Sequence, residues 1–149
     1  MIAERADLQR YLDARIPPPW FDGRIPDPST WEVRADVRPT PPATGASLTG
    51  IAVSGGVATG RARVVVDPRD PRGLEPGEVL VCALTDPSWT PLFLAAVAVV
   101  CEAGAVQSHA AIVSRDLGIP AVLSVPGITA VADGTMLHVD GTTGTVRIG

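Results

Sequence analysis

The chain of 149 residues is long enough for one domain with a hydrophobic core and an appendage. With 46% hydrophobic and 19% charged residues, it is predicted to be globular rather than disordered. Its net charge of −4 argues against nucleic acid as a partner, and the absence of lysine excludes a Walker phosphate loop, a Schiff base and a lysine nucleophile.

Residues 1–47 are expected to form a short helix and a proline-rich arm, because they hold eight of the fifteen prolines. Apolar residues four apart predict one stripe on a helix over Ala3 to Ile16. The aromatic side chains that follow either pack on the main domain or meet a partner protein. They are Trp20, Phe21 and Trp31.

The N-terminus lacks the apolar core of a signal peptide. The longest apolar run, Leu92 to Cys101, is too short to span a bilayer. We therefore expect a soluble, cytoplasmic protein that does not associate with a membrane. Cys82 and Cys101 fall inside apolar runs, which is typical of core thiols rather than of a disulfide framework or a metal site.

The folded domain is expected over residues 48–149. Strands are predicted at Leu48 to Val53 and at Arg61 to Val66, joined by the glycine-rich segment Ser54 to Gly60. Because neither a lysine nor a helix follows these glycines, a hairpin or corner turn is favoured over a phosphate cradle.

Two apolar runs, Glu78 to Ala83 and Val97 to Cys101, predict strands buried on both faces. Between them, Thr85 to Pro91 is expected to open a short helix, with Asp86 or Thr90 as its cap. Further elements are expected near the C-terminus, and together they make a mixed α/β domain. They are a strand at Ile119 to Leu123, a short helix at Ile128 to Ala132, and strands at Met136 to Val139 and Thr145 to Ile148.

The stretch from Glu102 to Val122 predicts a loop, a short helix and a strand. Ser108 is a natural N-cap whose hydroxyl can accept a bond from a free amide of the first turn, and Gly118 closes the helix. His109 then takes the first helical position, beside unpaired amides and the positive end of the helix dipole. Anions are held well at such a place, so an imidazole there can carry a phosphoryl group.

This stretch resembles the phosphohistidine signature of the phosphoenolpyruvate-utilising enzymes, a family that includes phosphoenolpyruvate synthase, pyruvate phosphate dikinase and the rifampicin phosphotransferases. The residues Ser108-His-Ala-Ala-Ile-Val-Ser-Arg-Asp-Leu-Gly-Ile-Pro-Ala-Val122 match nearly position by position, with Asp116 in place of the usual glutamate. Ala105 replaces the usual second glycine, and Gln107 replaces a threonine whose regulatory role is not carried over. Further likeness lies in Gly50 to Val64, Pro76 to Val81 and Val139 to Val146.

The resemblance implies a swivelling β/β/α phosphohistidine domain, with His109 as the catalytic residue. On an ideal helix, Arg115 lies about 240° around the axis from His109. We therefore expect it to pair with Asp116 or another carboxylate, or to dock the domain on a partner, rather than to contact the phosphate. The residues expected to form the loop and to stabilise the phosphate are Gly104, Gln107, Ser108, Ala110 and Ala111.

In the resembled family, a histidine domain swings between an ATP-grasp-type nucleotide-binding domain and an acceptor or phosphoenolpyruvate domain. This chain has room for neither, so Mg²⁺ and ATP or phosphoenolpyruvate are expected on partner polypeptides, with no cofactor on the chain itself. No histidine or carboxylate stands at metal-ligand spacing from His109, so no metal site is predicted.

Two other functions compete with a phosphoryl carrier. The fold is also suited to a non-catalytic interaction module, with His109 kept for packing and the proline-rich arm as the binding element. A hydrolase with Ser108 as nucleophile would need a base and an oxyanion hole, and the sequence lacks the Gly-x-Ser-x-Gly elbow. His138, in a strand pattern two positions before a turn, is expected to be structural.

Overall fold

The computed structural model describes residues 5, 7–8, 11–12, 14–17, 22–33, 40–70 and 72–149. The chain divides into two compact units, Met1–Arg38 and Pro39–Gly149, which are described separately. Among the described residues, no helix combines the length and the apolar character needed to cross a membrane.

The first unit contains a two-stranded antiparallel ladder, in which β1 (Arg15–Ile16) pairs with β2 (Glu32–Val33). The expected helix over Ala3 to Ile16 therefore does not reach its last two residues, and part of it lies outside the described residues, as do Trp20 and Phe21. The half-buried Trp31 donates its indole N–H to the carbonyl oxygen of Pro26, 3.1 Å away, within the same unit.

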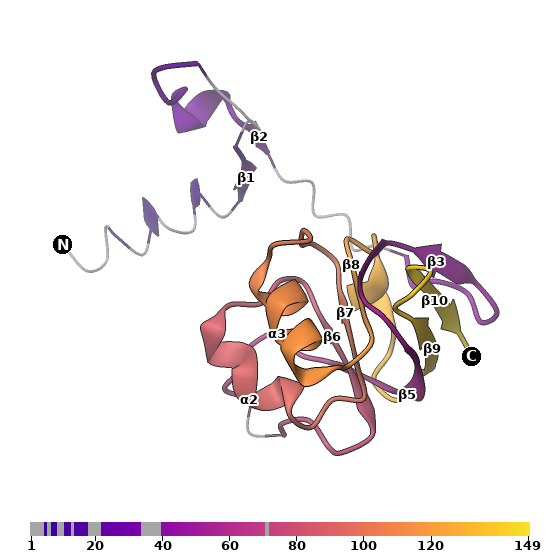
Figure 1. The fold of residues 1–149 in the computed structure, drawn as a ribbon. Coiled ribbons are helices and arrows are strands. Elements are labelled where there is room, and N and C mark those ends of the chain that lie inside the picture. Colours follow the sequence, from indigo (N-terminus) through magenta and orange to yellow (C-terminus); the bar gives the residue numbers. More distant parts are fainter. Residues whose placement is uncertain are drawn as a thin grey trace. The chain divides into compact units, whose positions relative to one another are not determined.

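The second unit is built from one mixed sheet with short helices between its central strands (Figure 1). Its described strands are β3 (Ser47–Thr49), β4 (Ile51–Ser54), β5 (Val57–Val64), β6 (Glu78–Cys82), β7 (Ala98–Cys101), β8 (Ala121–Leu123), β9 (Met136–Asp140) and β10 (Thr145–Ile148). Its helices are the 3₁₀ turns η2 (Pro87–Trp89) and η3 (Ile128–Ala130) and the α-helices α2 (Thr90–Phe93) and α3 (His109–Leu117).

The strand order is β3-β10-β9-β5-β6-β7-β8-β4, with parallel pairing from β5 to β8 and antiparallel pairing elsewhere. The first and last strands of this order, β3 and β4, are consecutive in the chain and are separated by Gly50 alone. The single strand expected over Leu48 to Val53 is thus two strands. A Cβ at Gly50 would overlap the carbonyl oxygen of Leu123 and lie 2.6 Å from Val125, so only glycine fits where the chain crosses between the two ends of the sheet.

Backbone hydrogen bonds also join the two ends of the domain. The amide of Gly45 donates to the carbonyl of Ile148 at 2.8 Å, and the amide of Ile148 donates to the carbonyl of Ala46 at 2.9 Å. The chain therefore enters the sheet beside β10, its last strand.

The glycine-rich segment between β4 and β5 is a corner rather than a hairpin, because β4 pairs with β8 whereas β5 pairs with β6 and β9. Only Gly55 and Gly56 lie between the two strands, and β5 starts four residues earlier than the sequence predicts. Gly56 adopts a φ of +110°, which explains a glycine at this corner.

The hydrophobic core has two layers, because successive residues of a strand face opposite sides of the sheet. On β6, Val79 and Val81 contribute to one cluster, formed with β9, β10 and η3, while Leu80 and Cys82 contribute to the other. This second layer is covered by α2 and α3, which lie on the side of β6 and β7 away from β9 and β10 (Figure 1). As predicted, Cys82 and Cys101 are buried free thiols, and their Sγ atoms are 3.5 Å apart in this layer.

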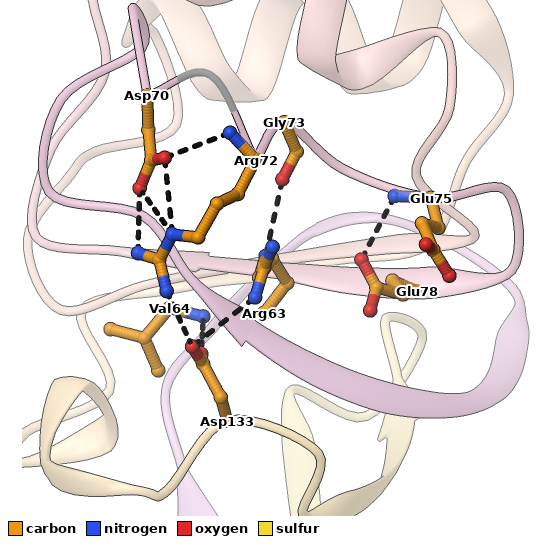
Figure 2. Close-up of polar contacts among 8 residues, drawn as sticks. All are labelled: Arg63, Val64, Asp70, Arg72, Gly73, Glu75, Glu78 and Asp133. Carbon is orange, nitrogen blue, oxygen red and sulfur yellow. Dashed lines mark hydrogen bonds and ion pairs between the residues drawn. The ribbon is translucent and has the colours of Figure 1, made fainter.

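A cluster of arginines and aspartates fastens the loop after β5 (Figure 2). One oxygen of Asp133 accepts the amide of Val64 at 2.7 Å, and the other lies 3.3 Å from Arg63 and 3.7 Å from Arg72. Arg72 also forms an ion pair of 2.6 Å with Asp70. The hydrogen bonds from the Arg72 side chain and amide lower the pKa of Asp70 to about 2.

Candidate functional site

The candidate site lies where two parallel strands end. The loop after β6 carries Thr85 and leads into η2 and α2, and the loop after β7 leads into α3. Carboxyl ends of neighbouring parallel strands meet at one edge of a sheet, which is where α/β proteins place their sites. His109 is the first residue of α3, as predicted.

The half-buried imidazole of His109 is held by three side chains from the preceding loop and helix. The hydroxyl of Thr85 is 3.1 Å from Nδ1, and the hydroxyl of Thr90 is 3.4 Å from Nε2. The ring of Phe93 meets the imidazole edge to face, with 5.7 Å between centroids. Thr85 is half-buried whereas Thr90 is exposed, so Nε2 is on the side that faces solvent.

The two threonines are functional candidates that the sequence did not reveal. The local sequence pattern suggested only that Thr90 or Asp86 caps a helix. The cap is Asp86, whose carboxylate accepts the amide of Ser88 at 2.8 Å. Thr85 and Thr90 are 24 and 19 residues from His109 in the chain, and no local motif signals a contact over such a separation.

Asp86 adds negative charge near the imidazole. Hydrogen bonds from the hydroxyl and the amide of Ser88 lower the pKa of Asp86, and the nearby His109 lowers it further. The carboxylate is therefore ionised at neutral pH and places a negative charge close to the ring of His109.

Ser108 occupies the N-cap position with extended backbone angles, but its hydroxyl makes no capping bond. The expectation that this hydroxyl accepts an amide of the first turn is wrong: the Oγ atom is buried without a hydrogen-bond partner. The first amides of a helix have no intrahelical acceptor, so Ala110 and Ala111 are left without a side-chain cap. These amides suit an anion that approaches the end of the helix.

The loop before His109 is fixed at its base. Gly104 has a φ of +151°, and a Cβ there would lie 3.0 Å from the side chain of Leu123. Its carbonyl accepts the hydroxyl of Ser124 at 2.7 Å. Glu102 accepts the amide of Gly127 and the hydroxyl of Thr129. At the other end of the loop, Gln107 is exposed.

Arg115 binds backbone rather than a carboxylate. Its Nε donates to the carbonyl of Val53 on β4 at 2.7 Å, and its Nη2 donates to the carbonyl of Val106 at 2.8 Å. The expected pairing with Asp116 or a neighbouring carboxylate is therefore wrong, and the alternative, docking on a partner, stays a prediction. Arg115 instead ties the loop before His109 to an edge of the sheet.

His138, the second histidine, lies on β9, with its Nδ1 2.7 Å from the hydroxyl of Thr59. Within the described part of the chain, no group of three or more histidine, cysteine or acidic side chains is arranged to hold a metal ion.

Residues 74–144, which include His109 and both threonines, match the family described as PEP-utilising enzyme, mobile domain. The chain contains this mobile domain. The relatives agree: a rifampicin phosphotransferase of Bacillus cereus is 42% identical over 103 residues, which are 68% of this chain and 12% of the relative. A rifampicin phosphotransferase of Streptomyces sviceus is 37% identical over 99% of this chain, which is 16% of its own length.

The mobile domain thus spans less than a fifth of the curated relatives that it matches. Its fold also occurs elsewhere. The holo-form of Thermococcus kodakaraensis aconitase X superposes with a TM-score of 0.53 and 23% identity, covering 70% of this chain and 99% of that one. At this identity the likeness concerns the fold alone.

Proposed function

We propose that the mobile domain is a phosphoryl carrier, which accepts a phosphoryl group on His109 and passes it from a donor protein to an acceptor site. The observation that carries this proposal is the setting of His109. Its Nε2 is on the solvent side of the ring, at the start of α3, in a domain whose relatives include phosphotransferases.

In the proposed step, Nε2 attacks phosphorus in line while the bond from phosphorus to the donor oxygen breaks. The neutral ring then carries its proton on Nδ1, where the half-buried Thr85 hydroxyl accepts it in a hydrogen bond. Positive charge develops on the ring as the N–P bond forms, and the ionised Asp86 nearby stabilises it.

The phosphoryl oxygens need donors at the solvent side of the ring. The side chain of Gln107 and the first amides of α3, those of Ala110 and Ala111, are the candidates. Preorganised donors of this kind stabilise developing negative charge without reorganisation. Gly104 and Ser108 shape the loop that carries them.

The donor and acceptor are proposed to reside on other domains or polypeptides. In this proposal, an ATP-grasp-type or phosphoenolpyruvate-binding partner supplies the phosphoryl group together with Mg²⁺, and the histidine domain swivels between partners in the cytoplasm. The long relatives support this arrangement, because 84% or more of each lies outside the aligned part.

The test is to incubate the full chain with a candidate partner and a donor labelled on its transferable phosphate. We expect an acid-labile, base-stable label on His109, and phosphorus NMR should assign it to Nε2. His138→Ala is the matched control and should label normally, whereas His109→Ala should not. Equal labelling of His109→Ala would overturn the assignment. Failure of every partner to label the chain would favour a non-catalytic interaction module.

A further inference from the structure

The arginines of the second unit fall into two groups. Four of the six have hydrogen bonds: Arg63, Arg69, Arg72 and Arg115 bind carboxylates or backbone carbonyls. By contrast, the side chains of Arg61 and Arg147 make no hydrogen bond or ion pair with any group in the described part of the chain. An unpaired guanidinium keeps its five donors available.

The two unpaired arginines lie on one face of the sheet, on either side of β9. Arg147 of β10 is directly opposite His138, and Thr59 of β5 is opposite His138 on the other side. Arg61 follows two residues after Thr59 and therefore points to the same face. This is the exposed face, because the alternate residues of β9 are in the core.

Two of the carboxylates near this face, those of Asp140 and Glu78, are already engaged. Asp140 accepts the amides of Thr142 and Thr143 at 2.9 and 3.0 Å. Glu78, opposite Arg61, accepts the amide of Glu75 at 2.9 Å. These acids and Glu75, which lines the same cavity as Arg61, reduce the local positive charge, but none of the three occupies the guanidinium donors.

Two shallow cavities adjoin on this face and share Met136. One, of about 220 Å³, is lined by His138, Arg147 and the C-terminal end of β10. The other, of about 430 Å³, is lined by Thr59, Arg61 and residues 75–78, which include Glu75 and Glu78. Their volumes suit a small molecule. The helices α2 and α3 lie on the other side of the domain and do not cover this face (Figure 1).

We propose that Arg61, His138 and Arg147 form a binding site for a small multivalent oxyanion of the phosphate class. Planar guanidinium groups bind such oxyanions in bidentate fashion, and the imidazole adds a third donor. In this proposal the hydroxyl of Thr59, 2.7 Å from Nδ1, donates to that nitrogen, so that the ring proton is on Nε2 and the Nε2–H group is the donor presented to the ligand. This site is separate from His109 and does not depend on the proposed phosphoryl transfer.

The test is a titration of the full chain with pyrophosphate at constant ionic strength, followed by calorimetry and by amide NMR. We expect shifts at β5, β9 and β10. Arg61→Gln and Arg147→Gln should each weaken binding about tenfold, and Arg69→Gln, which alters an exposed arginine paired with Asp67, should not. His109→Ala removes the other anion-binding candidate and should leave these shifts unchanged. Melting temperatures confirm that each variant is folded.

Two outcomes would overturn the proposal. Shifts confined to the start of α3, or an affinity for pyrophosphate in both glutamine variants equal to that of the unaltered chain, would show that this face does not bind small oxyanions. Binding of a polyglutamate peptide without binding of pyrophosphate would instead assign the face to an acidic protein segment.

Discussion

At the scale of single residues, the candidate site depends on how the two nitrogens of His109 differ. Thr85 meets Nδ1 from a half-buried position, and Thr90 meets Nε2 from an exposed one. A hydroxyl that accepts the Nδ1 proton selects the tautomer with a free lone pair on Nε2. In the proposed transfer the Thr85 hydroxyl accepts the Nδ1 proton and so acts as a positioning residue, and its effect is separable from that of the fold.

We predict that Thr85→Val slows phosphorylation of His109 about fivefold, since a hydrogen bond contributes about 1 kcal/mol. Nitrogen-15 NMR should show the ring shifting from one tautomer to a mixture, which a loss of packing alone would not cause. Thr59→Val is the matched control, because it removes the same contact from His138. An unchanged rate together with an unchanged tautomer in Thr85→Val would refute this role.

At the scale of elements, the passage from β3 to β4 leaves no room for a side chain at Gly50. We predict that Gly50→Ala lowers the free energy of unfolding by about 3 kcal/mol, because the added methyl overlaps Leu123 and Val125. Gly55→Ala is the control: its Cβ would meet only the hydroxyl of Thr142, at 3.6 Å, and the change should stay within about 0.5 kcal/mol. Urea unfolding measures both. Equal midpoints would show that the sheet adapts at Gly50.

The loop after β5 gives a prediction about pH. The pKa of Asp70 is lowered from its ordinary value of 3.8 to about 2 in the folded chain. The ion pair with Arg72 therefore stabilises the folded state fully above about pH 4, and this stabilisation is lost as the pH falls through about 2. An NMR titration of the Asp70 carboxyl should show a midpoint near 2. Arg72→Gln should raise it toward 3.8, while Arg147→Gln should not. A midpoint near 3.8 in the unaltered chain would show that Arg72 does not form this ion pair with Asp70.

At the scale of the whole molecule, the sequence predicted the strands and helices that depend on local patterns of residues. The apolar runs of β6 and β7 and the start and end of α3 follow from periodicity and capping residues. The contacts of Arg115 did not follow, because every residue of the chain offers a carbonyl and nothing marks that of Val53, 62 positions away. The threonines at His109 and the unpaired arginines required the strand order, which only the folded sheet reveals.

The hydrogen bonds between Gly45 or Ala46 and Ile148 have a consequence for how such a domain is joined to others. The two ends of the domain lie side by side, so it can be inserted into a surface loop of another polypeptide without moving the ends of that loop apart. A domain whose two ends are neighbours is thereby suited to insertion into a protein several times its size.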